Sequence, residues 1–352
     1  MKKIKILLIL TFFCLAFISL FTCYDCVAKG VTSGLYLCVN VVIPALFPFL
    51  CLTSCFAFSG VINVFANRLE RISKKFFNAS GYFIPVFLIS LVSGYPVGAS
   101  NAQTLYKCGR ISIQERNNIA LVSCSAGPGF VLIATGVAIL GSYECGVVLL
   151  ACHLLASITV AVVVSRFFKY TYFFKPTKNK IQIGDALVLG IASSTSSIIS
   201  ICAYTVIFSA VVNVLSGFLH NSVIFLPVVA LLEVTNAVNA LNHAGASLPL
   251  ISATIGFGGF SVIFQISSVL KNDRPPIFNI ILIRLFHAVL SALFCMLALE
   301  FFDITIPVYK GVLTAKKHFN DDFLFSFSLL GLLVVFLSFF NKLIKREKFN
   351  FI

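Results

Sequence analysis

Polar residues inside otherwise apolar runs are the part of this sequence that could do chemistry. Glu233 is the only acid deep in an apolar run, and Thr235, Asn236 and Asn239 follow it closely. Burying a charge in hydrocarbon is costly, so such an acid indicates a functional site by default. Arg284, which lies inside a later apolar run, is a further candidate for solute binding. The structural alternative for Glu233 is an ion pair with Arg284. Arg284 could also extend its charge to the cytoplasmic surface, and the sequence leaves these alternatives open.

A second group of candidates interrupts the apolar runs with glycine, proline and amides. These candidates for solute binding are Gly94, Pro96, Gly98 and Asn101 in the stretch LVSGYPVGASN, Gly127 and Gly129 in SAGPGF, and Gly258, Gly259 and Gln265 in GFGGFSVIFQ. Non-helical backbone at membrane depth survives only beside protein or a water-filled cavity, because its N–H and C=O groups lack partners in hydrocarbon. The half-helix N-termini at such breaks would present N–H groups to an anionic or polar solute. Asn101, Asn236 and Asn239 could instead cap broken helix ends.

The composition sets the class of protein. The chain is 59% hydrophobic and only 11% charged, which predicts an all-α polytopic membrane protein. Its net charge of +14 is spread over short clusters between apolar runs, so we expect no nucleic-acid partner. The sequence has no HExxH or GxSxG motif, and its one CxxC lacks a second pair. We therefore expect no enzyme activity, no cofactor and no metal.

The apolar runs predict about eight transmembrane helices and two re-entrant hairpins. The expected spans are residues 6–21, a kinked helix 31–65 followed by a basic loop, 119–140, 147–168, 187–218, 248–270, 275–299 and 323–340, and the hairpins are 82–106 and 222–241. If each hairpin returns to its own side, 21 of the 26 basic residues face the cytoplasm. The positive-inside rule then places both termini in the cytoplasm.

Three sequence echoes, in the same order, indicate an internal repeat. FSGVINV at 58–64 matches FSAVVNV at 208–214, the lead-ins to the two hairpins align without a gap, and SAGPGF matches IGFGGF. Counting crossings makes the two repeats inverted, with broken helices in each, as in many secondary transporters. The expected organisation is a membrane helix at 1–30, a first inverted repeat at 31–180, a second at 181–300, and a loop, final helix and basic tail at 301–352.

Five motifs together resemble a known family. VIPALFPF at 42–49, SGYPVGA at 93–99, GPGF at 127–130, LEVT at 232–235 and GFGGFSVIFQ at 256–265 resemble the YlbJ-type sporulation integral membrane proteins, in the nucleoside-recognition (Gate) group. The resemblance extends from about residue 34 to 299 and implies a core similar to that of concentrative nucleoside transporters. It also implies a role in spore formation, in which family members are linked to moving dipicolinic acid across the outer forespore membrane.

These observations predict a secondary transporter or facilitator of a small anionic or polar solute, with dipicolinic acid as the candidate solute. A nucleoside transporter and a non-transporting scaffold or sensor of sporulation are the alternatives. The expected partners are the solute and the lipid bilayer, either of the cell or of the forespore, and a homo-oligomer is left open.

Overall fold

The computed structural model describes residues 20–167, 183–219, 224–270, 274–301, 305–308 and 311–314, together with residues 10, 11, 14, 17 and 18. The regular secondary structure of this part of the chain is helical except for two short antiparallel strands, β1 (Thr305–Val308) and β2 (Gly311–Thr314). Four described helices are long and apolar enough to cross a membrane, or five if a bent pair near the N-terminus counts as one. The expected all-α membrane class is confirmed at this level. Most of the expected span 6–21 and all of 323–340 lie outside the described residues.

The N-terminal part is a bent helix followed by a separate surface helix. Helix α2 (Tyr24–Leu37) continues through the π-helical segment η1 (Cys38–Val42) into α3 (Ile43–Phe58). The helix axis before this junction and the axis after it differ by 58°. Proline at the start of α3 removes a backbone donor, which accounts for the bend. The prediction of one helix to residue 65 and a basic loop is wrong, because Gly60 adopts a left-handed conformation and the basic stretch forms α4 (Val61–Phe77).

Two stretches of the chain then repeat the same order of elements. Each has a pair of short helices, an interrupted helix and a long helix. In the first they are α5 (Phe83–Ser93), α6 (Val97–Lys107), α7 (Ile113–Val122), η2 (Gly129–Ile139) and α8 (Tyr143–Phe167). In the second, after the long α9 (Ile183–Leu219), they are α10 (Phe225–Leu232), α11 (Val234–His243), α12 (Leu248–Phe257), α13 (Gly259–Leu270) and α14 (Ile277–Phe301).

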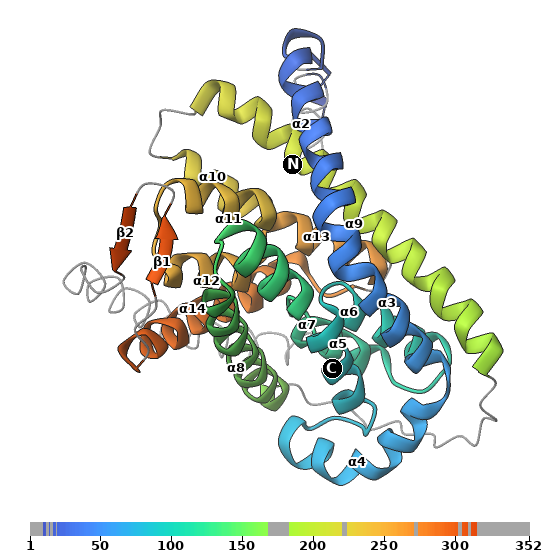
Figure 1. Ribbon diagram of the computed structural model, residues 1–352. Coiled ribbons are helices and arrows are strands. Elements are labelled where there is room, and N and C mark those ends of the chain that lie inside the picture. Colours follow the sequence, from blue (N-terminus) through green and yellow to red (C-terminus); the bar gives the residue numbers. More distant parts are fainter. Residues whose placement is uncertain are drawn as a thin grey trace.

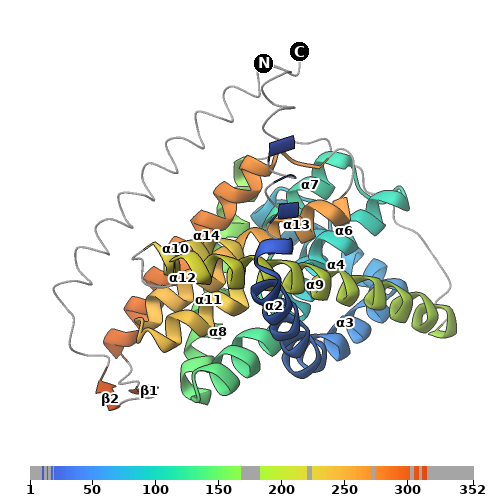
Figure 2. The same cartoon turned by 90° about the horizontal axis from the view of Figure 1, so that it is seen from above.

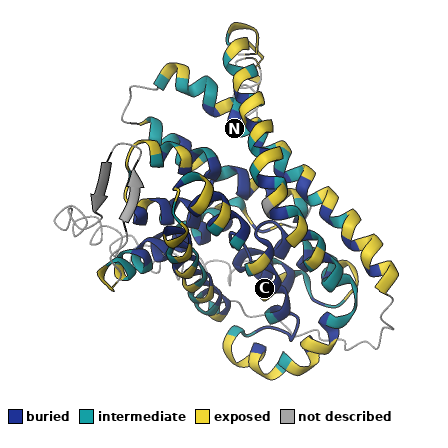
Figure 3. Ribbon diagram, in the orientation of Figure 1, coloured by how far each residue is buried: buried dark blue, intermediate teal, exposed yellow. Residues whose placement is uncertain are grey.

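The two stretches pack against each other element by element. Helix α8 packs on α14, α6 contacts α13, and α11 contacts η2. Helix α9 runs along one side of the molecule and crosses α2 and α3 (Figures 1 and 2). Buried residues gather where the short and interrupted helices meet, whereas α4 and α9 are largely exposed (Figure 3). The core is therefore built around the interruptions.

Loops of the two stretches lie at opposite ends of α8. At the end where α8 begins, the amide of Asn242 in the last turn of α11 donates to the carbonyl of Ile139, 2.8 Å away. At the end where α8 finishes, Arg166 Nε donates to the carbonyl of Phe76 at the end of α4, at 3.2 Å. The loop after α6 belongs to this second end, because Glu115 accepts the backbone N–H of Ser80 at 2.6 Å.

Candidate solute-binding site

The first hairpin and the first interrupted helix touch at their breaks. Between α5 and α6 the backbone turns at Gly94, whose φ is +82°, and between α7 and η2 it is irregular. A Cβ on Gly94 would lie 2.9 Å from the backbone nitrogen of Gly127. Only glycine allows both the left-handed turn and this approach. The two non-helical segments are thus held against each other.

The second hairpin and the second interrupted helix meet in the same way. Helix α10 ends at Leu232 and α11 begins at Val234, so the hairpin turns at Glu233. Gly259, with φ of +79°, lies so close that a Cβ there would be 2.9 Å from the carbonyl oxygen of Leu232. In each half of the molecule, therefore, the turn of the hairpin packs on the break of the interrupted helix.

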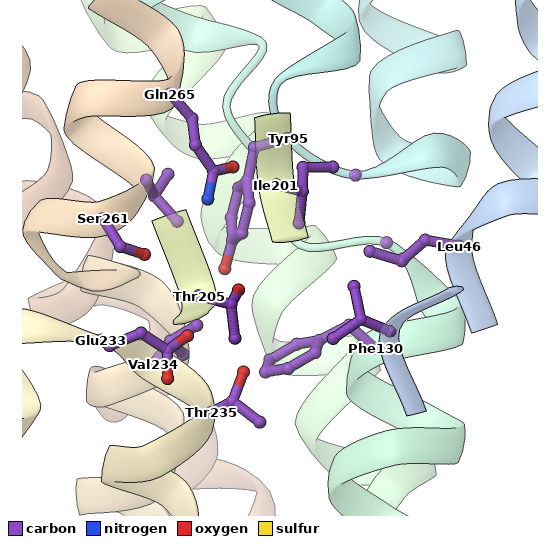
Figure 4. Close-up of a pocket in the computed structure, with 14 residues that line it drawn as sticks. Leu46, Tyr95, Phe130, Ile201, Thr205, Glu233, Val234, Thr235, Ser261 and Gln265 are labelled. Carbon is purple, nitrogen blue, oxygen red and sulfur yellow. The ribbon is translucent and has the colours of Figure 1, made fainter. Parts of the chain in front are cut away.

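The breaks meet at one cavity that is partly open to the surroundings: Gly94, Gly127 and Glu233 line it at three breaks, and Ser261 lines it just after the fourth. It lies between the breaks on one side and η1, α3 and α9 on the other (Figure 4). The lining residues are Val42, Leu46, Gly94, Tyr95, Gly127, Phe130, Ile201, Thr205, Glu233, Val234, Thr235, Ser261, Val262 and Gln265. The cavity thus joins residues from both halves of the chain.

Two polar atoms in this cavity have no hydrogen-bond partner. They are Oη of Tyr95 and Oε1 of Gln265, in side chains that are 9% and 3% exposed. Figure 4 shows both side chains pointing into the space above Glu233 and Thr205. A buried polar atom without a partner costs about 1–3 kcal/mol, so these atoms favour a polar ligand or water between them.

Glu233 faces the cavity and also caps a helix. Its carboxylate accepts the backbone N–H of Asn236 at 2.7 Å and the Asn236 amide at 3.0 Å, at the N-terminus of α11. The same amide group donates to Ser209 Oγ on α9 at 2.8 Å. Glu233 is 2% exposed. The predicted N-terminus of a half-helix is therefore occupied by a carboxylate of the chain itself.

Arg284 lies outside the cavity, and its donors are taken. It is 1% exposed, and Nε donates to the carbonyl of Phe257 at 2.9 Å. Its two Nη groups donate to the carbonyls of Gly256 and Cys124. Of the alternatives that the sequence left open for Arg284, neither a charge extended to the surface nor an ion pair with Glu233 is found among the described residues. Instead, the guanidinium satisfies carbonyls at the ends of α12 and α7, in both interrupted helices.

Other predicted residues support the breaks without lining the cavity. Pro96 precedes α6, Gly129 begins η2, and Gly258 ends α12 with φ of +78°. Gly98 also does not line the cavity and packs on Ser123 in the irregular segment between α7 and η2. The remaining two differ in exposure: Asn101 is buried, and Asn239 is exposed. Of the predicted residues, Gly94, Gly127, Glu233, Thr235 and Gln265 come together at the cavity.

Comparison with known proteins gives one relative. No family model matches the chain, and no solved structure matches it. The chain is similar to a sporulation membrane protein. This relative is the sporulation integral membrane protein YlbJ of Bacillus subtilis (strain 168), which is 23% identical over 84% of this chain and 83% of its own length. The similarity supports the YlbJ-type resemblance and an integral membrane protein; the link to nucleoside-recognition proteins stays a prediction.

Sequence reasoning missed nine of the fourteen lining residues, and four of these, Tyr95, Phe130, Thr205 and Ser261, are aromatic or carry a hydroxyl group. Tyr95 stands within the motif SGYPVGA, but its flanking Gly and Pro carried the signal for the break. Phe130 and Ser261 each follow a Gly-containing break, so a lining position could have been suspected. Thr205 lies in the middle of α9, and only the packing of α9 across the breaks brings it to the cavity.

The chemistry of the cavity is that of a polar binding site. It offers one carboxylate, several hydroxyls and an amide, and among the described lining residues there is no cationic side chain. In the described part of the chain, no group of three or more His, Cys, Asp or Glu side chains is placed to hold a metal ion. Helix α6 begins two residues after Tyr95 and has no side-chain cap; the N–H of its first residue, Val97, donates to the carbonyl of Gly94. The positive end of the helix dipole of α6 thus lies close in sequence to the cavity-lining Tyr95.

Proposed function

We propose that this chain is a secondary transporter or facilitator that carries a small polar solute through the cavity between its two halves. The observation that carries the proposal is the meeting of all four helix breaks at one cavity, into which the unpartnered Tyr95 Oη and Gln265 Oε1 point. Broken helices whose ends meet at a buried polar site are the arrangement that secondary transporters use to bind solutes. The similarity to a sporulation membrane protein supports a role for this transport in sporulation.

Alternating access follows if the halves are inverted in the membrane. The loops after α6 and α11 lie at opposite ends of α8, which supports hairpins that enter from opposite sides. Rocking one half against the other would then open the cavity to each side in turn. The contacts α6–α13 and α11–η2 would be the surfaces that slide.

The charge distribution selects the form of the solute. The carboxylate of Glu233 would repel a carboxylate of the solute. The N-terminus of α6, which has no side-chain cap, would attract a carboxylate of the solute. Dipicolinic acid fits this pattern with one carboxylate at α6 and one protonated carboxyl donating to Glu233. The rings of Tyr95 and Phe130 line the cavity and favour a flat aromatic solute.

A nucleoside is the second candidate solute. It also carries a flat ring, and its hydroxyl groups would donate to Glu233 and to Gln265 Oε1 without bringing a negative charge. The two candidates therefore differ in charge, and the response to external pH separates them. Uptake of dipicolinate should rise as the pH falls, since protonation removes the repulsion at Glu233, while uptake of a nucleoside needs no proton on the solute.

The test is uptake of labelled dipicolinate and of a labelled nucleoside into proteoliposomes that contain the purified protein. Tyr95→Phe removes only the unpartnered hydroxyl and should lower uptake about tenfold, corresponding to a hydrogen bond of about 1.4 kcal/mol. Tyr24→Phe, on the exposed surface of α2, is the matched control and should transport normally. If folded protein takes up neither solute, the chain is a membrane scaffold or sensor instead.

A further inference from the structure

Helix α4 has three rows of side chains with different chemistry. Ile62, Ala66 and Ser73 are spaced four and seven residues apart and are buried against the rest of the protein. The next row along the helix surface, Phe65, Ile72 and Phe76, has the same helical spacing but is exposed, at 46%, 48% and 44%. Residues spaced in this way share one face of a helix. Helix α4 thus has one apolar face against the protein and a second one directed outward.

A basic row adjoins the exposed apolar row. Arg68, Arg71 and Lys75 are spaced three and four residues apart, and all three side chains are exposed. The acid of this helix, Glu70, pairs with Lys74 at 2.7 Å and also accepts the N–H of Gly81. Within the described residues, Arg68, Arg71 and Lys75 form no salt bridge. The outward surface of α4 therefore combines three such cations with three large apolar side chains.

The position of α4 matches the level of a membrane surface. Its C-terminal end is bound by Arg166 in the last turn of the 25-residue span α8. Figures 1 and 3 show α4 at the periphery of the molecule, with exposed residues along its outer side. Lys107 and Arg166 add positive charge near this end, while Glu115 is fully buried. This end of the molecule therefore carries a net positive charge.

We propose that α4 lies in the headgroup layer and is a binding surface for anionic phospholipids. Arg68, Arg71 and Lys75 contact lipid phosphates, while Phe65, Ile72 and Phe76 enter the outer part of the acyl layer. An amphipathic helix in the plane of the interface binds through its buried apolar area and through attraction to anionic lipid, and each basic residue contributes separately. The adjoining apolar row favours a lipid as the ligand, because a free phosphate ion would contact only the basic row.

The chain contains no Trp, which allows a direct test on the full-length protein. Phe76→Trp places a single fluorophore in the exposed apolar row, and Leu155→Trp places one on the lipid-facing side of α8, where Leu155 is 52% exposed. Each variant is reconstituted with phospholipids whose acyl chains carry bromine, which quenches Trp on contact. At position 76, quenching by brominated phosphatidylglycerol should exceed quenching by brominated phosphatidylcholine at least about twofold at equal mole fraction. At position 155 the two lipids should quench equally.

The combined replacement Arg68→Gln, Arg71→Gln and Lys75→Gln should abolish the difference at position 76 and leave quenching by phosphatidylcholine in place. Salt should reduce the preference in the unaltered helix, because exposed charges are screened. Equal quenching by both lipids before any charge is removed would overturn the proposal, as would a preference that survives the triple replacement. Absence of quenching at position 76 by either lipid would show that α4 does not contact the bilayer.

Discussion

At the scale of single residues, Arg284 has the most consequential contacts. One guanidinium satisfies carbonyls of Gly256 and Phe257 in one half and of Cys124 in the other, and lies 5.5 Å from the ring centre of Tyr95. Carbonyls at a helix end need donors, and inside a membrane protein water seldom supplies them. The residue that the sequence suggested as a solute ligand is therefore a positioning residue. It holds the two interrupted helices together beside the cavity.

Arg284→Gln should lower the free energy of unfolding by at least about 2 kcal/mol, because several buried carbonyls lose their charged donor. Arg284→Lys should cost nearly as much, since one ammonium group cannot replace a planar fork that reaches carbonyls of different helices. Thermal unfolding in detergent measures both effects, with Lys107→Gln, an exposed basic residue, as the control. An unchanged unfolding temperature in Arg284→Gln would mean that the carbonyls find other donors.

The sequence could indicate Glu233 but not the partners of Arg284. An acid in an apolar run is conspicuous in any sequence, because the cost of burying it needs a reason. The carbonyls that bind Arg284 belong to residues as far away as Cys124, and a carbonyl has no sequence signature. Tyr95 was equally hidden, since an aromatic residue in an apolar hairpin is ordinary until its hydroxyl is found without a partner.

At the scale of elements, the contact between a hairpin turn and a helix break depends on glycine. Gly259→Ala should destabilise the protein more than Gly245→Ala. Both residues have a positive φ, at +79° and +68°, so each replacement costs about 1 kcal/mol of backbone strain. A Cβ at Gly245 would meet nothing within 4 Å, whereas one at Gly259 would lie 2.9 Å from the Leu232 carbonyl oxygen and force the second hairpin away. Unfolding temperatures of the two variants decide the matter, and equal losses would contradict the close packing.

Most helix breaks were predictable because glycine and proline disfavour helix locally, whatever surrounds them. Helix α4 was not, because its stretch has low overall hydrophobicity and a cluster of basic residues, which is typical of a loop between spans. What decides its structure is the buried row Ile62, Ala66 and Ser73, together with the bond from Ser73 Oγ to the carbonyl of Ser80 at 2.5 Å. Such tertiary packing stabilises an amphipathic helix beyond its local preference.

At the scale of the whole molecule, the two hairpins should open toward opposite sides of the membrane. Helix α8 has 25 residues and is about 37 Å long at 1.5 Å per residue, enough to cross a hydrocarbon core of about 30 Å. The exposed Cys108, in the loop after α6, belongs to the end near Arg166, and Ala244, after α11, belongs to the end near Tyr143. Basic residues gather at the end near Arg166, so this end should be cytoplasmic.

A membrane-impermeant maleimide should therefore modify Cys108 only in inside-out vesicles, and the thiol introduced by Ala244→Cys only in right-side-out vesicles. Peptide mass spectrometry reads both positions in one sample, so the unaltered Cys108 serves as the internal control for vesicle orientation. Two corresponding loops on opposite sides require inverted halves, because parallel halves would place both loops on the same side. Modification of both thiols from one side would remove the physical basis for alternating access, since both hairpins would then enter the cavity from the same surface.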